Sequence, residues 1–378
     1  MGRNEPDRQN EQNRIDYMMD EILEIAPYSL GKEEKHKLLN ARLQELTRVH
    51  YNTCTPYARM MDAVGLDMNH LPDYEQLPFL PVRLFKELEL RSCAAEDVIK
   101  TMTSSGTTGQ QVSRIFLDRN TSALQTKCLT KIVSEWLGTK RVPMLILDSS
   151  AVIKNRAMFS ARGAGILGFS MFGTKRQYAL NEEMELDIEG LKAFLDEHAG
   201  ERIFLFGFTF MIWQHFYKKL LETGYHPDLS QGVLIHGGGW KKLVQEQVSP
   251  AEFKQRLHEV CGIQPENVHD YYGMVEQTGT IYMECECGHL HAPIFSDVLI
   301  RRPLDFSLAE IGEEGIIEVV SMLPESYPGH VLLTEDKGVI LGEDDCPCGR
   351  KGKYFKINGR LKNAEIRGCS DTYAAKFK

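Results

Sequence analysis

The sequence has little of what several classes of protein require. It contains no apolar run of about 18 residues, so no segment is expected to span a membrane. Residues 1–6 lack the apolar segment of a secretory signal peptide, and the nine cysteines are an odd number. This combination favours a reducing cytoplasm and thiol or metal chemistry over disulfides. Positive charge is also scarce: the formal net charge is −9, whereas nucleic-acid binding needs a basic face. We therefore expect a cytoplasmic protein that neither enters a membrane nor binds nucleic acid.

Hydrophobic periodicity predicts an α/β fold. The N-terminal region, residues 1–95, shows mainly helical patterns. Farther along, short apolar runs typical of buried strands alternate with helical patterns, and this alternation implies a sheet with helices on its faces. The predicted strands are residues 142–147, 202–208 and 232–236, and the predicted helices are residues 15–25, 32–51, 120–137, 187–198 and 209–221, with Asn120, Thr121 or Ser122 capping the helix at 120–137 and Gly224 closing the last helix.

From about residue 293 the pattern changes to short strands and turns, which predicts a smaller, β-rich C-terminal part. A chain of 378 residues is longer than one typical domain, so one large and one small domain, or one elaborated domain, are expected. The strands predicted in this part are residues 294–300, 315–321, 331–334 and 354–357.

Residues 103–110 combine two glycines with five hydroxyl side chains. Glycine permits close backbone approach, successive N–H groups can form an anion-binding nest, and hydroxyls add further donors. A Walker A loop would need a lysine after Gly109, and none is there, so Mg²⁺ or a distant basic residue would have to balance phosphate charge. A surface loop without a ligand often has the same composition. The candidate phosphate-binding residues are Ser104, Ser105, Gly106, Thr107, Thr108 and Gly109.

Four later stretches place glycines, aromatics and charges where an α/β fold holds its ligands. Three glycines before an indole would let a flat ring lie against the backbone. An acidic turn could bind the two hydroxyls of a ribose, and a turn with an arginine could neutralise the negative charge of a phosphate. Each stretch alone can also be an ordinary turn or a solvated charge. The candidates are Gly237, Gly238, Gly239 and Trp240, then Tyr272, Gly273, Met274 and Glu276, then Asp336, and last Arg360.

Taken together, in this order and spacing, the five stretches resemble the core motifs of the adenylate-forming, or acyl-activating, enzymes. The resemblance implies ATP and Mg²⁺ as cofactors. It implies pyrophosphate binding at residues 104–109, and adenine, carboxylate and Mg²⁺ near residues 237–240 and 272–276. It further implies ribose binding by Asp336, and a hinge at Arg360. The catalytic residues implied within the core, residues 96–358, and at its hinge are Glu276 and Arg360.

The residues after the hinge position indicate which group of adenylate-forming enzymes this sequence resembles most. An acyl-CoA ligase would continue for about a hundred residues beyond the hinge, a domain-sized piece. Here only residues 359–378 remain, and they contain Cys369. In this respect the sequence is similar to the LuxE-type acyl-protein synthetases. That similarity implies a hinge followed by a mobile segment, in which Cys369 takes the acyl group of a fatty acid and passes it to a reductase in a hetero-oligomeric complex.

A thiol acts as a nucleophile only when its pKa falls towards neutral, and Lys362 and Arg367 lie near Cys369 in sequence, where they could supply the necessary positive potential. An inert thiol near the chain end is the alternative. Two other functions remain open: an acyl-CoA ligase with a reduced C-terminal domain, and a non-catalytic, zinc-containing scaffold subunit.

Two Cys-x-Cys-Gly knuckles form a separate signal. Tetrahedral zinc takes four ligands, so a structural zinc site is predicted that includes Cys346 and Cys348. The remaining two ligands would come from Cys285, Cys287 and His291. Four free thiols in paired turns are the alternative. Four further cysteines fit the pattern of small buried hydrophobes: Cys54, Cys93, Cys128 and Cys261.

Overall fold

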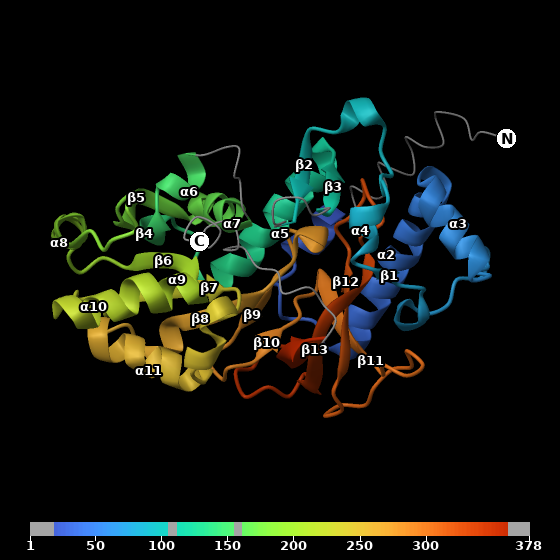
Figure 1. Cartoon of the computed structure of the whole chain (residues 1–378). Helices are drawn as coiled ribbons and strands as arrows, with labels where there is room; N and C mark the ends of the chain where they lie inside the picture. The colour runs from blue at the N-terminus through green and yellow to red at the C-terminus, as the bar shows by residue number, and fades with distance from the viewer. Residues whose placement is uncertain (1–18, 105–111, 155–160, 362–378) are drawn as a thin grey trace.

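A large mixed sheet runs through the whole molecule (Figure 1). The computed structural model describes residues 19–104, 112–154 and 161–361. The strands are β1 (Leu80–Pro81), β2 (Lys100–Thr103), β3 (Arg114–Leu117), β4 (Val142–Ser149), β5 (Gly173–Leu180), β6 (Ile203–Phe208), β7 (Gly232–Gly237), β8 (Val268–Tyr272), β9 (Tyr282–Glu284), β10 (Leu290–His291), β11 (Ser296–Arg301), β12 (Gly315–Ser321), β13 (Val331–Glu343) and β14 (Lys353–Arg360). The order across the sheet is β11-β12-β13-β14-β10-β9-β8-β7-β6-β4-β5, with β1 beside β13, while β2 and β3 form a separate hairpin.

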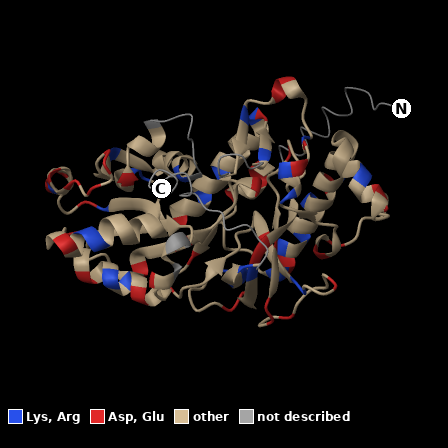
Figure 2. Ribbon diagram, in the orientation of Figure 1, with Lys and Arg blue, Asp and Glu red and all other residues tan. Residues whose placement is uncertain are grey.

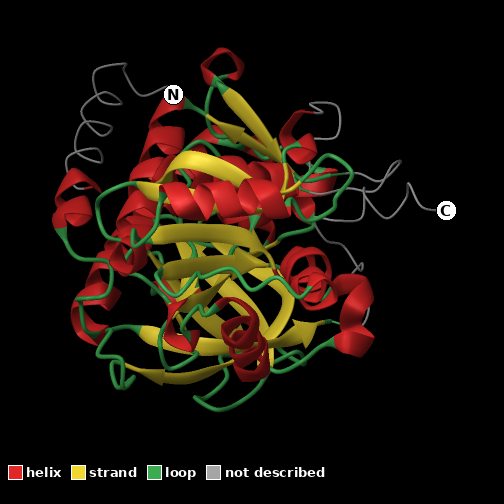
Figure 3. Cartoon of the chain, turned by 90° about the vertical axis from the view of Figure 1, so that its left-hand side faces the viewer, coloured by secondary structure: helices red, strands yellow, loops and turns green. Residues whose placement is uncertain are grey.

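Helices surround this sheet, as Figure 3 shows. Residues 19–24 are helical, which agrees with the described part of the helix predicted at 15–25. The α-helices are α2 (Lys32–Thr53), α3 (Thr55–Ala63), α4 (Leu84–Glu87), α5 (Arg119–Leu137), α6 (Ala151–Lys154), α7 (Ala161–Phe169), α8 (Ile188–Glu197), α9 (Thr209–Met211), α10 (Lys218–Thr223) and α11 (Pro250–Cys261). The other helical segments are η1 (Tyr74–Gln76), η2 (Ala95–Asp97), η4 (Ser170–Phe172), η5 (Ile212–Tyr217), η6 (Lys241–Glu246), η7 (Pro265–Asn267) and η8 (Val275–Gln277), of which η5 is a π-helix joining α9 to α10.

The parallel half of the sheet confirms the predicted α/β alternation. Strands β5, β4, β6, β7 and β8 pair in parallel, in a spatial order that corresponds to 2-1-3-4-5 along the chain. All three predicted strands are present as β4, β6 and β7. After β4 the chain continues to β5 on one side of this pair, whereas after β6 it continues to β7 on the other side. Such a switch point, at the carboxyl ends of the strands, is where doubly wound α/β folds bind ligands.

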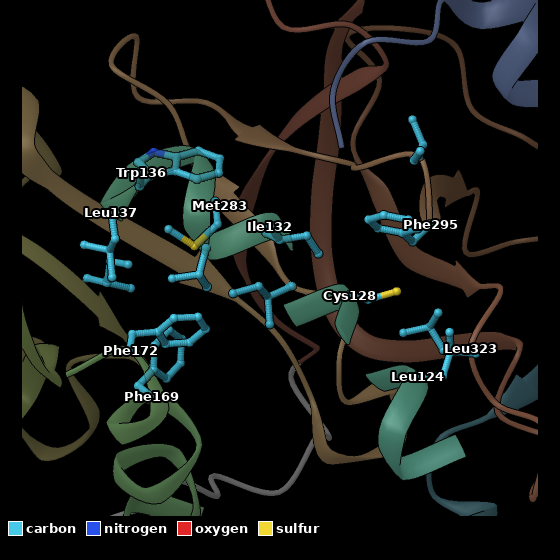
Figure 4. Packing of buried hydrophobic residues seen from close by; sticks show 14 of the residues in the cluster. Leu124, Cys128, Ile132, Trp136, Leu137, Phe169, Phe172, Met283, Phe295 and Leu323 are labelled. Carbon is cyan, nitrogen blue, oxygen red and sulfur yellow. The ribbon is translucent and has the colours of Figure 1, made fainter. Parts of the chain in front are cut away.

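The three central strands of this half, β4, β6 and β7, are buried on both faces, because their side chains alternate between two cores. On one face Met144, Ile146 and Phe206 join a cluster with α5 and α7. On the other face Leu145 and Leu147 join a cluster that includes residues of α8, α11 and the π-helix. Figure 4 shows the first cluster, into which α5 places Leu124, Cys128, Ile132 and Trp136.

The antiparallel half corrects the prediction at two places. Residues 335–338, predicted as an acidic turn, lie inside β13, and the predicted turn at Arg360 lies at the end of β14. Both stretches carry the polar and glycine residues of a turn, yet the strands pair through them with a register shift between Lys337 and Gly338. Such a bulge admits residues that a regular strand disfavours. Strands β11 to β14 also continue the same sheet as β4 to β8.

The helix cap at α5 also differs from the prediction. The side chain of Asp118 accepts a hydrogen bond from the Thr121 backbone N–H at 2.8 Å, so Asp118 is the N-cap. Any of the three predicted cap residues would have shortened the helix by at least two residues, because a cap at Asn120 makes Thr121 the first helical residue. The predicted C-cap at Gly224 is confirmed, with φ of 65° in the left-handed region that favours glycine.

Charged side chains gather on the outer helices and loops, whereas most of the strand ribbon in Figure 2 carries neither charge. Over residues 19–104, 112–154 and 161–361, no helix combines the length and the apolar character that crossing a bilayer requires.

Candidate nucleotide and acyl-activation site

The glycine-rich stretch lies at the carboxyl end of β7, beside the end of β8. Gly237 pairs with Tyr271 across the two strands. A Cβ atom at Gly237 would lie 2.6 Å from the Tyr271 ring, so only glycine lets that ring rest against the backbone. Gly238 follows with φ of 77°, in the left-handed region. The ring of Tyr271 thus lies against the backbone at Gly237, and a ligand ring beside the three glycines stays a prediction.

Trp240 packs inward. Its ring lies 5.0 Å from that of Trp213 and 6.1 Å from that of Phe253, between centroids, in edge-to-face contacts. These contacts anchor the end of the glycine-rich turn to the core on the α11 side of the sheet, and they fix where Gly238 and Gly239 lie.

Three of the predicted residues meet between β8, β13 and β14. The Tyr272 hydroxyl donates a hydrogen bond to Asp336 at 2.8 Å, and the Arg360 Nε lies 3.2 Å from the other carboxylate oxygen. Asp336 and Arg360 are direct partners in the register of β13 and β14. Burial raises the pKa of Asp336, while Tyr272 and Arg360 act in the opposite direction. Residues that are 64 and 24 positions apart in the sequence thus form one contact group.

Glu276 lies in η8, directly after β8, and is almost fully buried. Burial raises the pKa of its carboxyl, and the side chain of Ser113 opposes this rise. The Ser113 N–H in turn donates to the Ser104 hydroxyl at 2.9 Å, and the Ser104 N–H donates to the Ser113 carbonyl at 3.3 Å. The carboxylate therefore lies beside the base of the Ser/Thr/Gly loop, where a cation bound to phosphate would need an oxygen ligand.

Several predicted residues have no role in these contacts. Gly273 and Met274 continue from β8, and Met274 packs against a third core cluster, in which strands of the antiparallel half meet α3, α4 and β3. Five loop residues and the predicted acyl acceptor lie outside the described residues: Ser105, Gly106, Thr107, Thr108, Gly109 and Cys369.

One buried ion pair was not predicted from the sequence. Asp148 lies near the end of β4, at the switch point, and its carboxylate is 3.1 Å from the Arg162 Nε of α7. Burial raises the pKa of Asp148 to about 6, although Arg162 acts against the rise. A carboxylate directly after a predicted strand was the available signal, but its partner is 14 residues farther along, in a helix the sequence did not indicate.

The cysteine and histidine candidates form a second group, which could hold a metal ion. Ligand atoms of four residues all lie within 4.8 Å of one another: Cys285, His291, Cys346 and Cys348. The fifth candidate, Cys287, is exposed and is not part of this group. His289, which the prediction omitted, places its Nδ1 3.3 Å from the Cys346 sulfur.

Solved structures define the class. An open conformation of 2-hydroxyisobutyryl-CoA ligase, in complex with 2-HIB-AMP and CoA, superposes with a TM-score of 0.66 at 14% sequence identity, covering 89% of this chain and 77% of that one. The same ligase in its thioesterification state gives a TM-score of 0.66 at 15% identity, with 89% and 70% covered. The fold is that of the adenylate-forming ligases, which confirms the predicted fold class.

Sequence comparison defines the family. The family model described as "Acyl-protein synthetase, LuxE" matches residues 7–378. The long-chain-fatty-acid–luciferin-component ligase of Aliivibrio fischeri is 22% identical over 360 residues, covering 93% of this chain and 92% of its own. The enzyme of the same name from Vibrio harveyi is 22% identical over 361 residues, with 93% and 91% covered. The chain belongs to the acyl-protein synthetase, LuxE, family and is a ligase, so the predicted family is confirmed.

Proposed function

We propose that this ligase uses ATP to convert a fatty acid into an acyl-adenylate, and then carries the acyl group as a thioester on Cys369 for a reductase partner. The observation that carries the proposal is the contact group of Tyr272, Asp336 and Arg360. Tyr272 directly follows Tyr271, the strand partner of Gly237. A carboxylate held by a phenol and a guanidinium keeps unused lone pairs, which suit the two hydroxyls of a ribose. The names of the two bacterial relatives favour a long-chain acid.

In the first half-reaction, a carboxylate oxygen of the fatty acid attacks the α-phosphorus of ATP. The bond to the β-phosphate bridging oxygen breaks, and pyrophosphate leaves with the electron pair. Both reactants are anionic, so donors must be in place before charge develops. The loop beginning at Ser104 and the guanidinium of Arg360 are suited to this, and Glu276 would hold Mg²⁺, which supplies positive charge to the phosphates.

In the second half-reaction, the Cys369 thiolate attacks the acyl carbon, the bond to the phosphate oxygen breaks, and AMP leaves. The thiol proton goes to solvent when the thiolate forms. AMP is a far better leaving group than the oxide of a free carboxylate, which is why the adenylate must come first. The thioester keeps the acyl carbon reactive for reduction by a partner that supplies hydride.

The proposal is tested by separating the two half-reactions. Wild-type protein should catalyse fatty-acid-dependent exchange of pyrophosphate into ATP, and intact-mass analysis should show one acyl group per chain that hydroxylamine removes. Cys369→Ser should keep the exchange and lose the acyl-protein. Cys287→Ser, which removes another thiol, an exposed one, should keep both activities.

Each contrary outcome has a definite meaning. Acylation of Cys369→Ser at the wild-type rate would reassign the acceptor to another residue. Formation of acyl-CoA, without acyl-protein, when CoA is added would replace the proposal by an acyl-CoA ligase. Absence of exchange with every chain length would refute adenylation itself.

A further inference from the structure

We infer that this chain binds one structural zinc ion through four side chains that its sheet brings together: Cys285, His291, Cys346 and Cys348. This inference is independent of the proposed adenylation. The residues come from two connections, one between β9 and β10 and the other between β13 and β14. His291 lies on β10 and pairs directly with Tyr354 of β14, so the two connections meet along one pair of strands.

Both connections have the same backbone shape. In each Cys-x-Cys-Gly knuckle, the glycine N–H donates to the carbonyl of the first cysteine at 2.9 Å, from Gly288 to Cys285 and from Gly349 to Cys346. The two glycines have φ of 78° and 83°, which lets the chain turn back under the sulfur. Because the two turns have the same backbone shape, both can present a first-cysteine sulfur to a shared ion.

The distances between the ligand atoms fit a tetrahedral zinc ion. With Zn–S of about 2.3 Å and Zn–N of about 2.05 Å, neighbouring ligands should lie about 3.8 Å apart for S···S and about 3.6 Å apart for S···N. The Cys285 and Cys346 sulfurs are 3.9 Å apart, and the Cys348 sulfur is 3.4 Å from the His291 Nε2. A disulfide would require about 2.05 Å between sulfurs, so this pair is not one.

The geometry also selects four ligands from the five predicted candidates and the neighbouring His289. Cys287 is exposed and lies outside the group. His289 lies beside Cys346, and its ring stacks on Tyr354 at 4.8 Å, but its nitrogen does not lie within reach of all the other ligands. It is suited to donating a hydrogen bond to a zinc-bound sulfur, as groups around metal sites do.

The surroundings suit a closed, negatively charged centre. Three thiolates and one Zn²⁺ carry one net negative charge, and the guanidinium of Arg350 lies beside Cys348. Arg350 is held there by Glu286 and by the ring of Trp136, 4.6 Å away. With four protein ligands the ion keeps no open position for water, so its role is structural.

The ion would fix the hairpin that carries the candidate site. Cys346 and Cys348 close β13 and β14 at one end, and Asp336 pairs with Arg360 at the other. The hairpin has two register shifts between these ends, and strand register is set largely by the connection. Loss of zinc should therefore lower stability and weaken the placement of Asp336.

Zinc content tests the inference directly. Protein purified after growth with zinc should contain about one equivalent by elemental analysis, released in step with titration of its thiols by a mercurial. Cys285→Ser should lose most of the zinc and melt at a lower temperature, whereas Cys287→Ser, in the same knuckle, should match the wild type in both. Wild-type protein loaded with Co²⁺ should show the intense visible bands of tetrahedral cobalt thiolate, which tests the site without any variant.

Three results would overturn the inference: wild-type protein with no bound zinc or cobalt, zinc that survives in Cys285→Ser, or equal zinc loss in Cys287→Ser. Because metal content is measured without ATP or fatty acid, such a failure would leave the adenylation proposal standing, and loss of adenylation would leave the zinc measurement valid.

Discussion

Asp336 interacts with two partners, and both hold it in one orientation. Tyr272 donates a hydrogen bond to one carboxylate oxygen, and Arg360 lies beside the other. Only a fifth of the side chain is exposed, so an added polar ligand would bind where competing water is restricted. The residue is therefore preorganised to accept hydroxyl donors without moving.

The first prediction follows from this geometry. Asp336→Asn keeps the shape but removes the charge, so ATP should bind more weakly by about 1.5–3 kcal/mol, or about 10- to 150-fold in Kd. Titration calorimetry with ATP measures this. Glu335→Gln, which removes the other carboxylate near Arg360, should have a much smaller effect. Equal losses in the two variants would mean that Arg360, and not Asp336, governs the affinity.

For single residues, the sequence indicated candidate residues but did not predict which of them are in contact. Tyr272, Asp336 and Arg360 were each named as candidates, but the sequence did not predict their direct contact, because it ended the predicted strands before Asp336 and Arg360. The ion pair of Asp148 was missed because a carboxylate after a strand does not indicate where its partner lies, and Arg162 is 14 residues farther along.

Among the elements, α5 carries much of one core, and its start is well defined. Asp118 caps it through the Thr121 N–H, and Thr121 in turn accepts a hydrogen bond from the Ser326 N–H at 3.1 Å. The hydrogen bond from Ser326 connects the helix N-terminus to the antiparallel half, and the buried residues of α5 share one core cluster with strands of both halves. Removal of the capping side chain should therefore lower the free energy of unfolding of the whole protein.

The second prediction compares two neighbouring polar residues. Asp118→Ala should destabilise the protein by about 1 kcal/mol, because one N–H of the first turn loses its acceptor. Asn120→Ala should change stability little, since Asn120 is exposed and does not cap the helix. Urea denaturation of both variants gives the two values. A larger loss for Asn120→Ala would show that the cap lies where the sequence pattern placed it.

The sequence predicted three of the five parallel strands, β4, β6 and β7, because strands buried on both faces have continuous apolar runs. It did not predict β5, whose side chains are partly exposed. It failed at β13, which runs to Glu343 although the prediction ended it at Thr334. The residues that follow are acidic and glycine-containing, and in a strand they need the bulge that only the partner β14 provides. Local pattern cannot supply that information.

On the scale of the whole molecule, one buried carboxylate joins the N-terminal helices to the sheet. Asp297 of β11 lies 3.2 Å from the Lys35 Nζ of α2 and 2.8 Å from the Lys353 Nζ of β14, and accepts a hydrogen bond from the Tyr74 hydroxyl at 2.8 Å. Burial opposes ionisation, but the two lysines and the hydrogen bonds outweigh it and hold the pKa of Asp297 below its usual range.

The third prediction concerns acid stability. A lowered carboxyl pKa stabilises the fold fully above the unfolded value of about 3.9, and this stabilisation is lost as pH falls through the folded value. Asp297→Asn should therefore cost about 3–5 kcal/mol at pH 7, since it leaves two buried lysines without their anion. The difference from wild type should narrow steadily below pH 4 in denaturant titrations. A constant difference at all pH values would mean that packing, not charge, causes the loss.

Length, charge and motif order sufficed to predict the fold class and the family from sequence. They did not predict that the parallel and antiparallel halves would share one sheet, because the joining pairs, β8 with β9 and β10 with β14, involve strands of only two to eight residues. Long-range pairing of this kind also brings together Cys285 and Cys346, which are 61 positions apart in the sequence.

The π-helical turn between α9 and α10 has a consequence for how the length of this chain can vary. Such a turn is an α-helix that has taken in one extra residue and absorbed it locally, so the helix beyond it keeps its facing. Leu220, fully buried in α10, points to the core despite the wide turn at residues 212–217. One residue could be deleted within that turn and the helix would become regular while Leu220 stayed where it is. Insertions and deletions are usually confined to loops, but here a buried helix offers a position where they can be tolerated.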